Sequence, residues 1–218
     1  GVQTCALPIS AVSRIVIPTL LNDLRRELTW LDDDWSEALA HMKRDLSSAC
    51  DELESLLGEL PESITLDEFS KTHPQAFRQC ESAFPNLVRE RRTHPLKVLD
   101  RSLHHLGELA RVRTAVELLR DAKGDNAVRA LGQLLDSSHE SLRDLYEVST
   151  PEVESLHDVV RKGPQVLGAR LMGGGFGGNV LALVKAEKAS ALPALIDHVQ
   201  AGFYAPRNRQ ALQEGSVM

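Results

Sequence analysis

Long apolar runs, an excess of basic residues and paired cysteines are all missing from this sequence. The longest apolar runs, such as Val180–Val184, have the length of a strand and fall well short of the roughly 18 residues that a membrane-spanning helix needs. The 25 Lys and Arg residues are scattered and are outnumbered by 31 Asp and Glu residues, which argues against a nucleic-acid surface and a polybasic membrane patch. Cys5, Cys50 and Cys80 are far apart and form no CxxC pair, so neither a disulfide framework nor a zinc site is indicated. We therefore expect a soluble, cytoplasmic protein.

Both ends of the chain differ from ordinary protein termini. The first nine residues, Gly1–Ile9, resemble the in-frame translation of a sequencing adapter and are excluded from the fold prediction. The last residues, Glu214–Met218, end on an apolar step without a helix stop signal. We expect the chain to begin at a break within a longer gene and to have lost its natural end as well. With 218 residues, 42% of them hydrophobic, the chain is long enough to build a globular core.

Helical patterns dominate residues 10–92. Apolar residues recur at spacings of three and four from about Leu20 to Leu57, which predicts an amphipathic helix that Gly58 and Pro61 interrupt. A second helical stretch begins at Thr65, where Glu68 stands at the position of a capping box. The acidic run Asp32–Asp34 most simply caps a helix, and a metal site is the less favoured interpretation.

A helical hairpin is predicted next. The first helix runs from Pro95 to Lys123, and Gly124 ends it. Its apolar face is predicted to contain Leu99, Leu103, Leu106, Leu109, Val112, Val116 and Leu119. Asp125 or Asn126 is expected to cap the second helix, which runs toward Leu142.

A further helix, two strands and a last helix complete the predicted order. Thr150 is an N-cap candidate, followed by Pro151 and acidic residues, so a helix is expected as far as about Val160. Val166–Met172 and Asn179–Val184 read as strands with glycines between them. From about Glu187 to Phe203 helical spacing returns, with Leu192, Leu195, Ile196 and Val199 predicted to face inward. The predicted fold class is α+β, helix-rich, with a small antiparallel sheet.

The connection between these strands contains five glycines in six positions, Gly173–Gly178, interrupted only by Phe176. Without Cβ atoms, backbone N–H groups can approach a phosphate closely. For a glycine cluster taken alone, a tight hairpin turn is the favoured explanation. The glycines alone therefore leave a structural and a binding interpretation open.

Three known phosphate motifs fit the glycines only in part. A dinucleotide-binding motif must open a helix, but a strand follows here. A Walker A loop requires Lys and then Ser or Thr, where this chain has Asn179 and Val180. A protein-kinase glycine loop would need a catalytic loop downstream, and only 33 residues follow Lys185. All three motifs are excluded.

A family resemblance accounts for the glycines together with their surroundings. Gly168–Asn179 resembles the third conserved motif of the GHMP kinases, most closely the version found in galactokinases. Ser138–Glu152 is similar to the galactokinase segment that precedes this motif, and it lies at the right distance. His104, Glu108 and Arg111 resemble a helix of the same family that carries a His and a Glu one turn apart. The resemblance covers about Pro95–Phe203.

The resemblance implies a two-domain sugar kinase of which this chain holds the carboxyl-terminal part. Residues 93–218 would be the GHMP kinase C-terminal domain, a ferredoxin-like α/β sandwich with added helices, and residues 10–92 a helical region continuing from a missing amino-terminal domain. The complete enzyme would transfer the γ-phosphoryl group of Mg-ATP to the anomeric hydroxyl of galactose or a related sugar. The catalytic Asp, the Mg2+ ligands and the main ATP-binding loop would lie in the missing domain, so the chain alone is expected to be inactive.

The resemblance assigns this chain a supporting loop and no catalytic residue. Gly173, Gly174, Gly175, Phe176, Gly177 and Gly178 would support phosphate and substrate binding through backbone groups, with Phe176 as a packing anchor. Two departures leave the sugar open among galactose, an aminosugar, a uronic acid and arabinose. Asn179 replaces a small or sulfur-bearing residue, and no Tyr- and Arg-rich sugar-binding stretch is recognisable between Ser10 and Arg92. A non-catalytic sensor of sugar and ATP is the alternative function, and a helical interaction module is a third. Nucleic-acid or membrane partners are not expected, and the oligomeric state is left open.

The histidines carry weaker signals. His104 and Glu108 have the spacing of a metal site or proton relay, which far more often reflects a surface or packing pair. His94 and His105 lack neighbouring carboxylate or Cys ligands, so metal binding is not expected. His139 lies in a helical stretch without a third orienting group, and we expect it to stabilise the helix end rather than act as a base.

Overall fold

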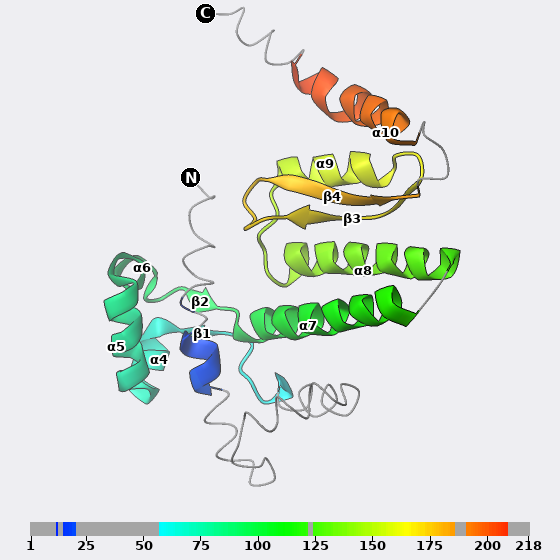
Figure 1. The fold of residues 1–218 in the computed structure, drawn as a ribbon. Helices are drawn as coiled ribbons and strands as arrows, with labels where there is room; N and C mark the ends of the chain where they lie inside the picture. The colour runs from blue at the N-terminus through cyan, green and yellow to red at the C-terminus, as the bar shows by residue number, and fades with distance from the viewer. Residues whose placement is uncertain (1–11, 13–14, 21–56, 122–123, 186–190, 209–218) are drawn as a thin grey trace, which may run out of the picture. The chain divides into compact units, whose positions relative to one another are not determined.

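The computed structural model describes residues 12, 15–20, 57–121, 124–185 and 191–208 (Figure 1). The chain forms two compact units, Gly1–Leu106 and Gly107–Met218. The predicted amphipathic helix from Leu20 to Leu57 and the acidic run Asp32–Asp34 fall almost entirely outside the described residues. Within the described residues, none of the helices combines the length and the apolar character that crossing a bilayer requires.

Between residues 64 and 96, the described part of the first unit contains three short helices beside a minimal sheet. The helices are α4 (Leu66–Thr72), α5 (Pro74–Ala83) and α6 (Pro85–Arg91), and the sheet pairs β1 (Ile64–Thr65) with β2 (Pro95–Leu96) in antiparallel fashion. Leu66, Phe69, Phe77, Cys80, Val88 and Leu96 contribute to its buried core. The predicted capping box at the start of α4 is confirmed: the Glu68 N–H donates to Thr65 Oγ1 over 3.1 Å, and the Thr65 N–H donates to Glu68 Oε2 over 2.8 Å.

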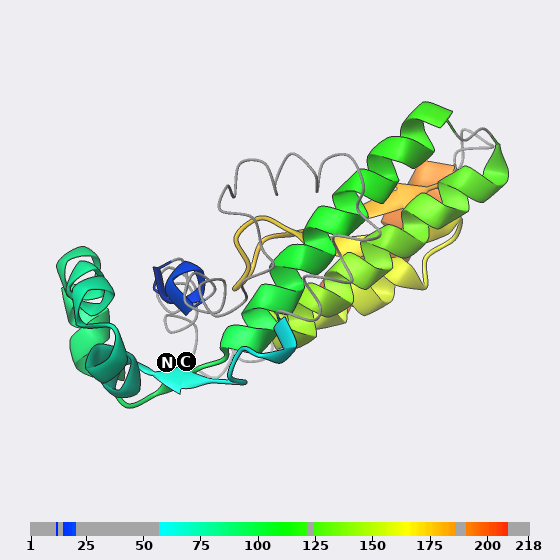
Figure 2. The same ribbon diagram turned by 90° about the horizontal axis from the view of Figure 1, so that it is seen from below.

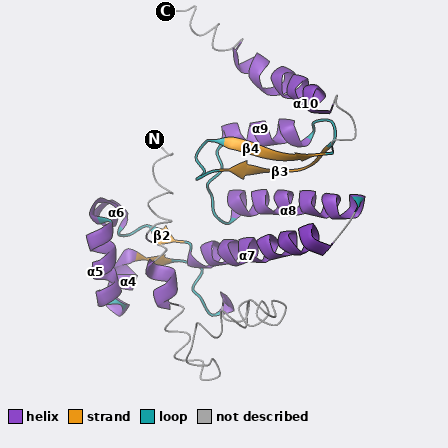
Figure 3. Ribbon diagram, viewed as in Figure 1, coloured by secondary structure: helices purple, strands orange, loops and turns teal. Residues whose placement is uncertain are grey.

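The second unit packs helices along a two-stranded sheet (Figures 1 and 3). Strand β3 (Val166–Met172) pairs antiparallel with β4 (Asn179–Val184), so both predicted strands are confirmed. Helices α8 (Asp125–Asp144) and α9 (Pro151–Arg161) both pack against β3, and α10 (Ala191–Val199), which continues into the π-helical turn η1 (Gln200–Tyr204), packs against α9. Residues 107–121 of α7 (Val98–Asp121) run alongside α8 (Figures 1 and 2). The predicted class, helix-rich α+β with small antiparallel sheets, is confirmed.

Two glycines bring α8 and β3 into backbone contact. An ideal Cβ at Gly132 would lie 2.3 Å from the carbonyl oxygen of Leu167, and one at Gly168 would lie 2.0 Å from the carbonyl oxygen of Gly132. Real Cβ atoms do not approach other atoms this closely, so both positions need glycine. The helix can therefore lie close enough to β3 for its side chains to reach the strand's backbone.

The sequence patterns placed two helix starts incorrectly. Helix α7 begins at Val98 rather than Pro95, because Pro95 and Leu96 pair with β1. Neither Asp125 nor Asn126 caps α8: Gly124, with a φ of 91°, occupies the N-cap position, and the Asp125 carboxylate accepts a hydrogen bond from Lys185 Nζ over 2.6 Å. This long-range ion pair is absent from local sequence patterns.

Two predicted apolar faces were also partly wrong. Four members of the α7 face are exposed, namely Leu109, Val112, Val116 and Leu119. In α10, Leu195 is buried as predicted, but Leu192 and Ile196 are 61% and 51% exposed. Periodicity identifies the apolar side of a helix, whereas its neighbours decide how much of that side is covered.

Candidate functional site

The glycine-rich loop Gly173–Gly178 joins β3 to β4 and has an unusual backbone. Positive φ angles occur at Gly173 (109°), Gly175 (85°), Phe176 (60°), Gly177 (133°) and Gly178 (106°). Phe176 is the one member of this set with a Cβ atom, and it occupies the left-handed helical region, which side-chain-bearing residues rarely adopt. Its conformation must be held by contacts elsewhere.

Those contacts fix Phe176 to the segment before α9. Its N–H donates to the carbonyl oxygen of Val148 over 2.7 Å. Its side chain packs against the buried cluster of Leu142, Val148, Val153 and Leu171. At the neighbouring Gly175, an ideal Cβ would lie only 2.4 Å from Val148 Cβ. One side of the loop is therefore in tight contact with Val148.

The rest of the loop faces open space. Ideal Cβ atoms at Gly173, Gly174 and Gly177 would meet no atom within 4 Å, and Gly173 and Gly174 are exposed. The loop contains no charged side chain, so it can attract an anion only through its backbone N–H groups. Among the described residues, no group of three or more His, Cys, Asp or Glu side chains is placed to hold a metal ion. This side of the loop therefore presents bare backbone, and the described residues supply no cluster of metal ligands.

The segment leading to α9 has the helix start that the sequence predicts. Thr150 is the N-cap, and its Oγ1 accepts from the Val153 N–H over 3.3 Å; Pro151 is the first helical residue. Ser149 Oγ donates to Glu154, an acid of the first turn. These bonds fix the chain close to Val148, the residue that holds the loop.

A polar cluster along β3 was missed by the sequence analysis. The Ala169 N–H donates to Asp136 Oδ1 over 2.9 Å, and the Leu171 N–H donates to His139 Nδ1 over 3.1 Å. The expectation that His139 stabilises the helix end was therefore wrong. Asp136 and His139 lie one helical turn apart on α8 and reach alternate residues of β3, a spacing that was visible in the sequence but had no assigned partner.

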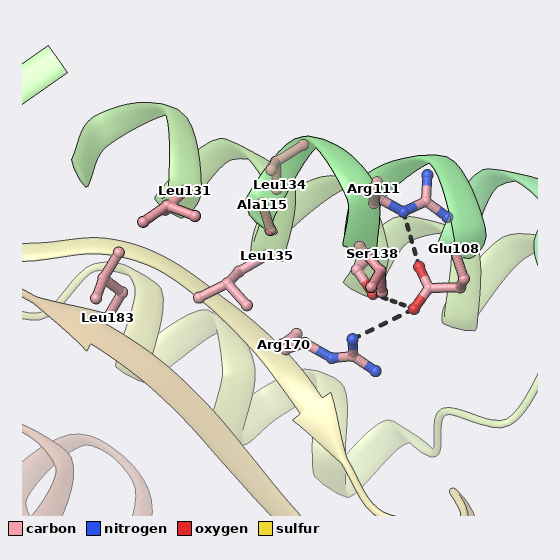
Figure 4. A pocket seen from close by; sticks show the side chains of 10 residues that line it. Glu108, Arg111, Ala115, Leu131, Leu134, Leu135, Ser138, Arg170 and Leu183 are labelled. Atoms are coloured by element: carbon pink, nitrogen blue, oxygen red, sulfur yellow. Dashed lines mark hydrogen bonds and ion pairs between the residues drawn. The ribbon is translucent and has the colours of Figure 1, made fainter. Parts of the chain in front are cut away.

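Glu108 forms a second polar cluster beside an apolar cavity (Figure 4). Its carboxylate accepts hydrogen bonds from Arg111 Nε at 2.7 Å, Ser138 Oγ at 2.9 Å and Arg170 Nη1 at 3.3 Å. Burial raises the pKa of Glu108, but the hydrogen bonds from Ser138 and Arg111 and the two guanidinium charges outweigh it and hold the pKa below its ordinary value. The cavity measures about 280 Å³, and its apolar wall consists of Val112, Ala115, Leu131, Leu134, Leu135 and Leu183.

Of the three residues His104, Glu108 and Arg111 that the sequence resemblance singled out, the structure brings two together. Glu108 and Arg111 form an ion pair, whereas His104 is a buried residue of the first unit. His94 also lies in the first unit, and its side chain is exposed. The loop, the β3 cluster and the Glu108 cluster all lie in the second unit.

Comparison with known proteins matches this second unit to a family. The family model described as GHMP kinases C terminal matches residues 110–203, which include α8, α9, both strands of the hairpin and the glycine-rich loop. Residues 110–203 are therefore similar to the C-terminal domain of the GHMP kinases.

Within that class the domain is galactokinase-like. The chain is 37% identical over 148 residues to the galactokinase of Bos taurus, a match covering 62% of this chain and 36% of that protein. It is 38% identical over 144 residues to the galactokinase of Homo sapiens, covering 60% of this chain and 35% of the relative. Over a shorter stretch of 85 residues it is 51% identical to the galactokinase of Thermotoga maritima, covering 39% of this chain and 23% of the relative.

The chain spans only about a third of the length of these mammalian relatives. The solved structure of Lactococcus lactis galactokinase complexed with galactose is 26% identical to this chain, with a TM-score of 0.41, and the match covers 79% of this chain and 39% of that one.

Proposed function

We propose that the complete protein is an ATP-dependent sugar kinase that transfers the γ-phosphoryl group of Mg-ATP to the anomeric hydroxyl of galactose or a related sugar. The observation that carries this proposal is the Gly173–Gly178 loop, with its bare backbone on one side and its fixed contact with Val148 on the other. The similarity to galactokinases supports it, and so does the family model, whose match to residues 110–203 includes this loop.

The loop would act as one wall of the active site. Phosphoryl transfer depends mainly on positioning and on stabilising the charge on the phosphoryl oxygens. Backbone N–H groups with no Cβ beside them can approach those oxygens, and a loop fixed at Phe176 need not reorganise to do so. Bound ATP with Mg2+ would supply the transferred group and shield its charge.

The catalytic Asp and the Mg2+ ligands are proposed to come from a domain outside this chain. On this proposal residues 93–218 are the carboxyl-terminal domain, residues 10–92 lead into it, and the 218-residue chain alone does not phosphorylate sugars. We propose a cytoplasmic enzyme whose partners are a small sugar and ATP.

The test is a phosphoryl-transfer assay on the protein encoded by the completed gene. Galactose, galactosamine, galacturonic acid and arabinose would each be supplied with Mg-ATP, and the sugar 1-phosphate would be measured. We expect one of these sugars to be phosphorylated, and the 218-residue chain to give no product under the same conditions. If ATP and a sugar bind in calorimetric titration but no product forms, the protein is a sensor and the proposal fails. Binding of neither ligand also overturns it.

A further inference from the structure

The free edge of β3 is bonded to side chains in place of another strand. While β4 pairs with β3 on one side, the Ala169 N–H donates to Asp136 and the Leu171 N–H donates to His139. His157 Nε2 lies 3.1 Å from the carbonyl oxygen of Ala169. Three side chains from α8 and α9 thus satisfy the backbone of β3 immediately before it enters the glycine-rich loop.

The bond from Leu171 requires one form of His139. Because the Leu171 N–H donates to Nδ1, that nitrogen must carry a lone pair, and the neutral ring holds its proton on Nε2. His139 Nε2 lies 3.2 Å from Glu154 Oε1 but is not aligned with it as a hydrogen bond. A second proton on the ring would have to enter at Nδ1, where it would oppose the Leu171 N–H and break the bond.

The surroundings of His139 disfavour that second proton. The ring is 1% exposed and stacks on His157 with centroids 3.6 Å apart and an angle of 14° between the planes. Burial lowers the pKa of His139, the electrostatic interactions with His157 and Arg143 lower it further, and Glu154 opposes them. Asp144 is the other ionisable group that interacts with it from α8, and β3 presents backbone groups, since the Arg170 side chain binds Glu108.

The loop is connected to this bond through Leu171. Leu171 is 1% exposed and belongs to the same buried cluster that Phe176 packs against. The chain from Leu171 to Phe176 is therefore held at both ends, by His139 at the first and by Val148 at the second. Between these points an ideal Cβ at Gly173 or Gly174 would meet no atom within 4 Å.

We propose that neutral His139 is a positioning residue for the glycine-rich loop, and that proton uptake at its Nδ1 releases the end of β3 and loosens the loop. The anchoring concerns this chain alone. Its consequence for phosphoryl transfer rests on the proposed function.

Three variants separate this role from a general effect on stability. His139→Asn places Oδ1 where Nδ1 stands, so it keeps the acceptor and cannot be protonated at ordinary pH. His139→Leu removes the acceptor. Glu140→Gln changes the exposed neighbour on the same helix and serves as the matched control.

The measurement is amide hydrogen exchange of residues 171–178 in the 218-residue chain, corrected for intrinsic rates, together with the ¹⁵N shifts of the His139 ring. In the wild-type chain and in Glu140→Gln, the protection of the Leu171 amide against exchange should fall about tenfold as the pH drops from about 7.5 to about 5.5. A tenfold change corresponds to the stabilisation that one hydrogen bond provides. His139→Asn should keep its protection at both pH values, and His139→Leu should lack it at both.

Unchanged protection of Leu171 in folded His139→Leu would overturn the proposal. If His139→Leu does not fold, the wild-type chain and His139→Asn still test the proposal. If the protection of the Leu171 amide depends on pH equally in these two proteins, the proposal is rejected. Ring shifts that show a proton on Nδ1 at pH 7.5 also reject it.

In the completed enzyme, His139→Asn should flatten the acidic limb of the kcat profile, an effect that a structural role without titration would not produce. If no sugar is phosphorylated, the proposed function fails while the exchange experiment still tests the anchor. If sugar is phosphorylated but the acidic limb of His139→Asn matches that of the wild type, the catalytic consequence fails and the proposed function stands.

Discussion

Gly174 and Gly175 are neighbours in one loop, yet their surroundings differ completely. A Cβ at Gly174 would have nothing within 4 Å, and its φ lies outside the region that disfavours side chains. A Cβ at Gly175 would overlap Val148 Cβ at 2.4 Å and the Val148 carbonyl oxygen at 2.7 Å, at a φ of 85°. Alanine substitutions at these two positions therefore separate the effect of disturbing the contact with Val148 from the effect of adding a methyl group on the open side of the loop.

Gly175→Ala is expected to displace the loop from Val148 and to lower the free energy of unfolding by about 1–3 kcal/mol, while Gly174→Ala changes it by less than about 0.5 kcal/mol. Thermal unfolding of the two variants checks this. In the completed enzyme both variants should reduce kcat, Gly175→Ala because it moves the N–H groups that would face the phosphates, and Gly174→Ala because its Cβ would stand beside those groups on the open side of the loop. Equal melting temperatures for the two variants would contradict the contact with Val148.

At the scale of elements, α8 is the helix that organises the hairpin. It contacts β3 through the Gly132–Gly168 pair, and it supplies Asp136 and His139 to the strand's free edge. Asp136 and His139 can reach the backbone of β3 only because the two glycines let α8 lie close to the strand. If α8 moved away from β3, both the glycine contact and these hydrogen bonds should weaken.

Gly132→Ala tests this element directly. Helix propensity alone favours Ala over Gly by about 1 kcal/mol in a helix interior. We expect the opposite result, a loss of about 1–3 kcal/mol, because the new Cβ would overlap the Leu167 carbonyl oxygen. Gln133→Ala, at the next and exposed position of α8, provides the propensity baseline. Chemical denaturation measures both, and a stabilised Gly132→Ala would show that α8 can move away from β3 at little cost.

For the molecule as a whole, two opposing effects act when the pH falls. The net charge of −6 at pH 7 means that acidification first reduces electrostatic self-repulsion, which favours the folded state. His139 and Glu108 act in the other direction. The pKa of each is lower in the folded than in the unfolded chain, so the unfolded chain takes up protons first as the pH falls.

We expect these local groups to dominate. The melting temperature should be constant between about pH 7 and 8, begin to fall below about 6.5, the ordinary pKa of His, and fall again below about 4.3, the ordinary pKa of Glu. His139→Asn should remove the first decrease, and Glu108→Gln should reduce the second, to which the lowered pKa values of Glu68, Asp125 and Asp144 also contribute. Thermal melts at a series of pH values measure this, and a melting temperature that rises between pH 7 and pH 5.5 would show that overall charge prevails.

Much of the fold could be predicted because its signals are local. The strands Val166–Met172 and Asn179–Val184, the capping box at Thr65 and the N-cap at Thr150 all matched the structure. Each depends on hydrogen bonds or backbone angles within a few residues, where residue type largely decides the outcome. The glycine-rich loop was found for the same reason, since repeated positive φ angles require glycine.

Contacts between distant residues could not be predicted in this way. His139 binds Leu171 across 32 positions, Lys185 binds Asp125 across 60, and Gly132 meets Gly168. In each case the residue type permits many partners, and only the packing of α8 against the hairpin selects one. The loop's residues are therefore evident from the sequence, whereas its anchoring by His139 and Val148 depends on tertiary packing, because a hydrogen bond between remote groups forms only after the chain has brought them together.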